Sequence, residues 1–285
     1  MFWQVLTIEH TKITRRSMFR VLLILIALIV LIIQLVLFGT HENGINGLAI
    51  PEEERLGLAE AVTWPGALVN ILTYISGNAF GGLFFVILVG ALTASEYTWR
   101  TMQLWLIRGI SRPLLIVAKF TALLLPAMLL VMVAFLIGGS ITALTSIHIN
   151  DTLNLNQLDY AQMALSILRT VYSLLPYGAL TFFLAVASRS PVIAISGGLS
   201  YVLLLESLLI QLLGLLGEPV RAMVRFLPNR LSENILAANQ LALGVEWSAT
   251  SGLLDPWAAA LGIACWTLLF LGLSQWIFTK QDLGE

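Results

Sequence analysis

The feature that most constrains this chain is a series of six apolar runs, each long enough to cross a lipid bilayer. A helix needs about 20 mostly apolar residues to span the hydrocarbon core. The runs occupy residues 19–39, 67–94, 113–145, 161–187, 191–216 and 257–278. A helix also satisfies its backbone polar groups within the segment, as lipid requires. The runs therefore predict an all-α membrane protein with one transmembrane domain over residues 1–285.

The composition supports a lipid environment. Of the 285 residues, 58% are hydrophobic and only 11% are charged, whereas soluble domains carry about 25% charged residues. So few polar side chains cannot cover a surface that faces water. The net charge of −1 gives no general attraction to nucleic acid. We expect the lipid bilayer as a partner and no nucleic acid.

The distribution of Lys and Arg predicts the orientation. Basic residues concentrate before the first run and between the second and third, while residues 40–66 and 146–160 are mainly acidic. Cytoplasmic segments of membrane proteins are richer in Lys and Arg. Both termini and the segment 95–113 are therefore expected to be cytoplasmic. Residues 217–256 depart from the trend, because they contain three Arg residues.

Residues 2–17 are typical of a helix that lies on the membrane surface. Phe2 and Ile13 fall on one apolar face, and Glu9 falls within the same sector. Lys12 and Arg16 lie close enough on that side to neutralise Glu9. We therefore predict an N-terminal interfacial helix in which these three charged side chains interact.

The segment 217–256 is too long for a simple connection, since loops beyond about 15 residues usually carry structure or function. Within it, residues 231–244, "LSENILAANQLALG", predict a short helix. We expect a helical hairpin-like segment before the last span. It is either partly re-entrant or lies on the membrane surface.

The segment between the second and third runs, "SEYTWRTMQLWLIRGISRP", is unusually rich in Trp, Tyr and Arg for a connector. A helix over 95–109 has a polar face with Glu96 and Arg100 and an opposite face with Met102 and Trp105. Gly109 and the residues up to Pro113 end it. One interpretation is an anchor at the lipid headgroups. The other is a helix that docks in a groove of a soluble partner, which the aromatic and Arg content favours.

This segment, extended to Phe120, resembles the first cytoplasmic loop of ABC-2-type transporter permeases, the membrane subunits of a large group of ABC transporters. The shared pattern consists of Glu96, Tyr97, Arg100, Thr101, Arg112 and Lys119. The N-terminal segment with Glu9, Lys12 and Arg15 is similar to the interfacial helix of that family, and "RFLPNRLSENILAAN" is similar to its segment before the last span. The chain departs from the pattern at Gly109-Ile110, where many relatives have Pro followed by Val or Ile.

The resemblance implies a subunit of an ATP-driven transporter, of the exporter kind, in a prokaryotic inner or plasma membrane. The loop helix would be a coupling helix that fits a groove of a separate ATPase subunit. ATP and Mg would bind to that subunit. A second permease copy, or a related permease, would complete the substrate path. The expected contacts with the ATPase are Glu96, Tyr97, Arg100, Thr101, Trp105 and Arg108.

The chain itself is not expected to be an enzyme. It has no Gly-Lys pair, which a phosphate-binding P-loop requires, so ATP hydrolysis belongs to another chain. An intramembrane protease or lipid-modifying enzyme would need an Asp pair or a base beside a nucleophile, and no predicted span contains Asp or His. We therefore expect no catalytic, cofactor-binding or metal-binding residues here.

Arg169 and Glu206 are charged residues inside apolar runs, where charges are costly and usually functional. One hypothesis is that they pair with each other or line the substrate pathway. The alternative is that Arg169 extends to the membrane interface. Gradient-driven carriers often hold charged pairs near mid-membrane. An ion-gradient-driven secondary carrier is therefore the alternative function that these two residues indicate.

Overall fold

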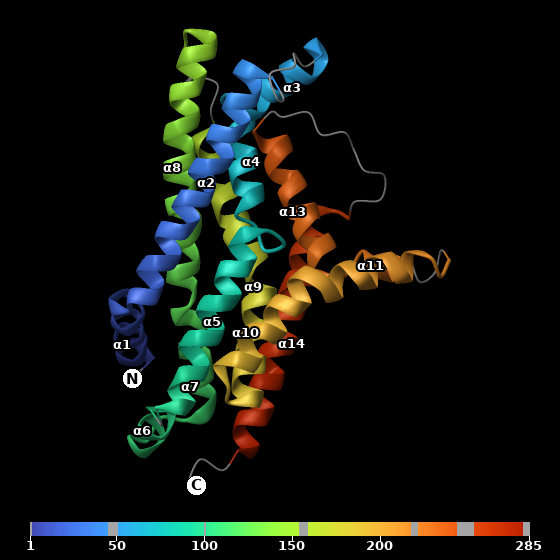
Figure 1. Ribbon diagram of the computed structural model, residues 1–285. Coiled ribbons are helices and arrows are strands. Elements are labelled where there is room, and N and C mark those ends of the chain that lie inside the picture. The colour runs from blue at the N-terminus through green and yellow to red at the C-terminus, as the bar shows by residue number, and fades with distance from the viewer. Residues whose placement is uncertain are drawn as a thin grey trace.

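The computed structural model describes residues 2–44, 51–99, 101–153, 159–217, 222–243 and 254–281. Within these ranges the chain forms helices and no strand. Figure 1 shows an elongated bundle with the long helices running roughly along one axis. The predicted all-α fold is confirmed.

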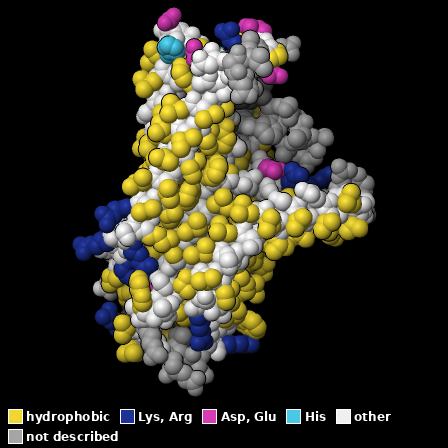
Figure 2. All heavy atoms as spheres, viewed as in Figure 1, with side chains coloured by type: hydrophobic (Ala, Val, Ile, Leu, Met, Phe, Trp, Pro, Cys, Tyr) yellow, Lys and Arg dark blue, Asp and Glu magenta, His cyan; other side chains and the backbone are white. Residues whose placement is uncertain are grey.

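Among the described residues, six helical segments are long and apolar enough to cross a membrane. They are α2 (Ser17–Asn43), α5 (Phe80–Thr98), α7 and α8 together (Arg112–Ala122 and Leu124–Asn150), α9 (Tyr160–Ser188), α10 to α11 (Pro191–Ser200 and Glu206–Gly214) and α14 (Pro256–Lys280). A π-helical turn, η2 (Tyr201–Leu205), joins α10 to α11. On the face shown in Figure 2, apolar side chains dominate the middle of the bundle. The chain is a multi-pass membrane protein.

The second run differs from the prediction of one continuous span. It contains two helices, α4 (Gly66–Tyr74) and α5, separated by residues 75–79. The preceding helix, α3 (Glu52–Val62), meets α4 at a bend of 75°. In the break, the Ser76 hydroxyl donates to the Thr73 carbonyl at 2.7 Å. A Cβ atom on Gly77 would lie 2.1 Å from the Ser173 carbonyl oxygen of α9, so only glycine fits there. The break thus lies where the backbone packs directly against α9.

The third span is interrupted at Leu123, between α7 and α8. Pro126 follows three residues later and has no N–H to donate to the Ala122 carbonyl. The chain therefore leaves the regular helix at this point. Pro176 also falls within a span, but α9 continues through it.

Helix α9 lies at the centre of the bundle and contacts α5, α8, α10, α13 and α14. Its Tyr177 and Phe182 are among the largest fully buried side chains. Gly178 lets α5 approach closely, because an added Cβ atom would lie 2.2 Å from the Phe85 ring. The core therefore forms around α9.

The predicted helix before the last span is present as α13 (Pro228–Ala242). Its Leu231 and Ile235 pack against Ala259 and Ile263 of α14, and another part contacts α9. Figure 1 shows α13 beside α14, while α11 projects away from the bundle. The tertiary contacts thus hold α13 inside the protein. Residues 218–221 and 244–253 of the predicted hairpin lie outside the described residues.

One end of the bundle carries both described ends of the chain. Figure 1 places α1 (Phe2–Arg15), α6 (Thr101–Ile107) and the C-terminal end of α14 there. Helix α1 packs against α7. Lys and Arg side chains are prominent near this end, and acidic side chains gather at the opposite one (Figure 2). This basic end contains the candidate functional site.

Candidate functional site

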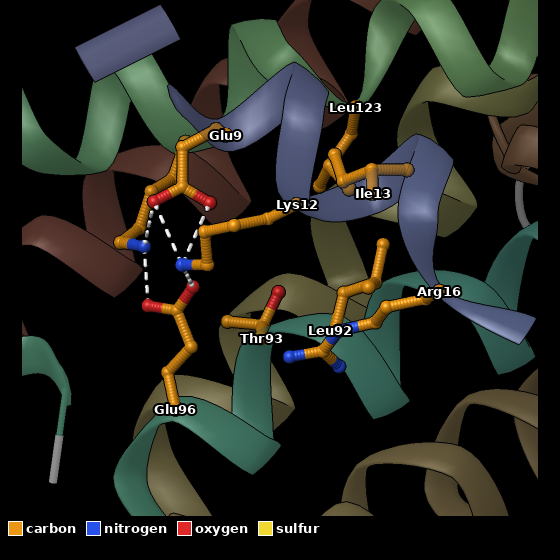
Figure 3. A pocket seen from close by; sticks show the side chains of 9 residues that line it. Glu9, Lys12, Ile13, Arg16, Leu92, Thr93, Glu96 and Leu123 are labelled. Carbon is orange, nitrogen blue, oxygen red and sulfur yellow. Dashed lines mark hydrogen bonds and ion pairs between the residues drawn. The ribbon is translucent and has the colours of Figure 1, made fainter. Parts of the chain in front are cut away.

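Four charged side chains from three helices meet at the basic end of the bundle. We call Glu9 and Lys12 of α1, Glu96 of α5 and Lys119 of α7 the charged cluster (Figure 3). The Lys119 Nζ atom lies 2.9 Å from Glu9 Oε1 and is also bonded to Glu96 Oε2. The Lys12 Nζ atom lies 2.6 Å from Glu96 Oε1 and 3.2 Å from Glu9 Oε1. Each ammonium group therefore contacts both carboxylates.

Three of the four side chains in the charged cluster are buried: Glu9 is 5% exposed, Glu96 4% and Lys119 6%. Removing charges from water costs several kcal/mol for each ion unless partners compensate. The two positive and two negative charges balance, and the cluster borders a cavity of about 20 Å³. A space of that size holds about one water molecule. The arrangement ties α1, α5 and α7 together.

Lys12 stays positively charged near neutral pH. Burial lowers the pKa of its ammonium group, but Glu96 and Glu9 together raise it more, so the net pKa lies above the usual 10.5. A raised pKa means that the charged form is stabilised by folding. This contribution is fully present below the unfolded value and is lost as the pH rises through the raised pKa. The ion pairs of Lys12 therefore persist across the physiological range.

The local sequence explains why Glu9 points inward. Val5, Glu9 and Ile13 recur every four residues, so they share one face of α1, and all three are buried. The predicted interaction of Lys12 with Glu9 is present. Arg16 instead donates from Nη1 to Ser95 Oγ at 3.0 Å, and its guanidinium lies 4.7 Å from the centre of the Trp99 ring.

The segment after α5 is not one helix over residues 95–109. Helix α5 ends at Thr98, and α6 begins at Thr101. Gly109 has φ = +78°, which favours glycine, and Pro113 lies in the first turn of α7. The predicted helix end at Gly109–Pro113 is therefore present, while the start of the helix is displaced.

The faces of α6 also differ from the expectation. Met102 is 1% exposed and Trp105 8% exposed, so both pack into the core. Trp99, Leu104 and Ile107 are 61%, 55% and 80% exposed. Leu104 and Ile107 lie one turn apart on α6, and Trp99 precedes that helix, so the chain exposes three apolar residues around α6 that the sequence analysis did not single out. We call these three residues the α6 surface.

The remaining predicted contact residues have different environments. Tyr97 and Thr101 are half-buried, and the Thr101 hydroxyl donates to the Glu96 carbonyl at 3.3 Å. Arg108 is exposed, and its guanidinium lies 5.8 Å from the centre of the Trp105 ring. Arg100 lies outside the described residues. Among the described members of the predicted set, Arg108 is the exposed one, and it directly follows Ile107 of the α6 surface.

Arg112 joins α7 to the C-terminal end of α14. Its Nη1 atom donates to the carbonyl oxygens of Phe278, Thr279 and Gln281 at 2.8, 2.7 and 3.2 Å. The last carbonyls of a helix have no intrahelical donor, and a positive charge there is favourable. Arg112 thus caps the last span, a role that no local pattern indicated.

We expect the Arg112→Gln variant to destabilise the C-terminal end of α14 by about 1–3 kcal/mol, because its last carbonyls lose a charged donor. The measurement is the rate at which trypsin cleaves after Lys280 in the purified protein, which should rise severalfold. Arg108→Gln is the matched control, since Arg108 is exposed. Equal cleavage rates in the Arg112 variant and the wild type would contradict this role.

Arg169 and Glu206 are not brought together. Arg169 Nη1 donates to the Ala238 carbonyl at 3.5 Å. Glu206 is buried and accepts hydrogen bonds from the Asn229 backbone N–H at 2.6 Å and the Tyr177 hydroxyl at 3.1 Å. The hypothesis that they form a direct pair therefore finds no support in the structure.

No group of three or more His, Cys, Asp or Glu residues is placed to hold a metal ion in the described part of the chain. The charged cluster contains two lysines, which repel a cation. Its chemistry suits structural coupling between helices.

The fold and this site define a multi-pass helical membrane protein in which a charged cluster fastens the N-terminal helix to the second and third spans. A family model described as "Protein of unknown function (DUF2705)" matches residues 27–284. The chain belongs to this family, since the match covers most of its length. A comparison with curated proteins found no match.

Proposed function

We propose that this protein is the transmembrane subunit of an ATP-driven ABC transporter, of the ABC-2 permease type and the exporter kind. It forms the substrate path together with a second permease copy or a related permease. A separate ATPase subunit binds to the segment 95–113 on the cytoplasmic side. Both termini lie on that side of a prokaryotic inner or plasma membrane. ATP and Mg bind to the partner subunit.

The observation that carries this proposal is the charged cluster. The cluster joins α1 to the end of α5 and to α7. Helices α5 and α7 directly precede and follow α6 in the sequence. A displacement of α6 is therefore passed to the second and third spans through short connections and buried ion pairs. This is the mechanical link that a membrane subunit driven by a separate ATPase requires.

The α6 surface is the proposed contact with the ATPase. Exposed apolar side chains beside an Arg are typical of helices that dock in a partner's groove. Glu96 and Trp105 are buried, so we assign them to the support of α6 rather than to direct contact. Arg108 remains a proposed contact, together with Trp99, Leu104 and Ile107.

The test is to purify the tagged chain in mild detergent from its own membranes and to identify the proteins that accompany it. We expect a P-loop ATPase in near-stoichiometric amount. Leu104→Asp with Ile107→Asp should reduce its recovery at least about tenfold, which corresponds to about 1.4 kcal/mol. Both side chains are exposed, so the fold is retained.

Leu56→Asp is the matched control, because Leu56 is also exposed and lies on α3, away from α6. It should leave recovery of the ATPase unchanged. Full recovery with the double variant would contradict the α6 surface as the contact. If the wild-type chain repeatedly purified without an ATPase, this would contradict the proposal that it is a subunit of an ABC transporter.

A second candidate is an ion-gradient-driven secondary carrier. The interruption between α4 and α5 and the buried Glu206 favour it, because such carriers use broken helices and buried charges. Transport that continues without ATP and stops with an uncoupler would support the carrier. Transport that stops when ATP is depleted at constant membrane potential would support the ABC subunit.

A further inference from the structure

Polar side chains form a continuous stripe on α9. Ser166, Thr170, Ser173 and Tyr177 follow one another at intervals of three or four residues, so they share one helix face. Each is at most 1% exposed. We call this stripe, together with Asn239 of α13, the polar seam. Thr170 and Ser173 donate to carbonyls of α9 itself, and Tyr177 donates to Glu206, so among the described residues the unpaired atoms of the seam are at its Ser166–Asn239 end.

One end of the polar seam has unused hydrogen-bonding capacity. Asn239 Nδ2 donates to the Ser166 carbonyl at 3.3 Å and to Thr170 Oγ1 at 3.4 Å. Within the described part of the chain, Ser166 Oγ and Asn239 Oδ1 have no hydrogen-bond partner, although both residues are fully buried. Water normally satisfies such atoms. A water molecule at this end would complete the hydrogen bonds of both atoms.

The other end of the polar seam reaches Glu206. The Tyr177 hydroxyl donates to Glu206 Oε2, and the Asn229 backbone N–H at the start of α13 donates to Oε1. Asn229 in turn accepts from Asn78 Nδ2 at 3.0 Å, in the break between α4 and α5. Glu206 thus connects three irregular points of the fold: the break, the start of α13 and the π-helical turn.

Among the described residues, no basic side chain pairs with Glu206. The titratable groups around it are Tyr177 of α9, Tyr201 of η2 and Glu233 of α13. The rings of Tyr177 and Tyr201 lie 6.4 Å apart. Glu206 itself is 1% exposed. Burial without a counter-charge favours the neutral form of a carboxyl group, whereas the hydrogen bonds from Tyr177 and Asn229 favour the charged form.

We propose that Glu206 reversibly binds a proton, which reaches it through the polar seam from the Ser166–Asn239 end. The proton adds to the carboxylate and gives a neutral carboxylic acid, and the Tyr177 hydroxyl keeps its hydrogen bond to Oε2. The Asn229 N–H continues to donate to the other oxygen, now to a neutral acceptor. Hydrogen bonds to charged acceptors are stronger, and a negative charge favours a helix N-terminus. Proton binding therefore weakens the tie between Glu206 and α13. This inference goes beyond the proposed function and does not depend on it.

The experiment is infrared difference spectroscopy of the full chain in lipid vesicles while the buffer is acidified across the neutral range. The wild type should gain a carboxylic acid C=O band. Glu206→Gln should lack this band, and Glu233→Gln should retain it as the matched control, because Glu233 is partly exposed and pairs with Arg230. An unchanged band in the Glu206→Gln variant, or no band in the wild type, would overturn the proposal.

Tyr177→Phe keeps the test decisive if the Glu206→Gln variant does not fold. It preserves the carboxyl group and removes one hydrogen-bond partner, so the band should shift in frequency. A band at the wild-type frequency would mean that another carboxyl group takes up the proton.

Asn239→Leu tests the route. Exchange of the acid proton for deuterium should slow severalfold while the band persists, and an unchanged exchange rate would exclude the polar seam as the path. None of these measurements involves an ATPase, so they fail or succeed separately from the proposed function.

Discussion

Replacing Lys119 with methionine is expected to lower the free energy of unfolding by about 3–5 kcal/mol, because it leaves one negative charge of the two buried carboxylates uncompensated. Lys119 contacts both Glu9 and Glu96, and all three side chains are buried. After the substitution, Lys12 alone faces two negative charges. The measurement is the unfolding transition of the purified protein in detergent.

Two comparisons separate this effect from a general loss of charge. Lys280→Met removes an exposed lysine whose Nζ lies 4.1 Å from the Trp276 ring centre, and it should change stability by no more than about 0.5 kcal/mol. Adding Glu9→Gln to Lys119→Met restores the charge balance and should recover part of the loss. If the Lys119→Met variant were as stable as the wild type, this would refute the coupling role of the charged cluster.

Replacing Gly82 with alanine is expected to cost about 3 kcal/mol, at the upper end of the usual range for overpacking. An added Cβ atom would lie 1.7 Å from the Gly77 carbonyl oxygen. The Gly82 N–H also donates to the Ser76 carbonyl at 2.9 Å. The obstacle is backbone rather than a flexible side chain, so the turn between α4 and α5 has to open. The loss should appear in the same unfolding transition.

Gly272→Ala is the control, because no atom lies within 4 Å of an added Cβ atom at that position of α14. It should stabilise the protein by about 0.5–1 kcal/mol, since alanine favours helix more than glycine does. If Gly82→Ala changed the stability as little as Gly272→Ala does, this would contradict the close backbone approach in the turn between α4 and α5.

Features that depend on neighbouring residues could be predicted from the sequence. Apolar length predicted six candidate spans, because the bilayer thickness fixes the length that a helix needs. The helix α13 and the turn at Gly109 followed from local patterns. The pair of Glu9 with Lys12 lies within one helical turn. The orientation, the ATPase contact and the transport function stay predictions.

Features that depend on which helix faces meet came only from the tertiary structure. Lys119 is 110 residues from Glu9 in the sequence, and no local period relates them. Trp105 is buried because the core lies on its side of α6. Glu206 is paired with the start of α13 instead of Arg169.

Apolar periodicity specifies which face of a helix is buried, but not which helix covers it. The sequence by itself therefore determined that this protein is a helical membrane protein with six candidate spans. Packing around α9 decided which charged and polar groups come together, because burying them is favourable only where the partners from other helices are already in place.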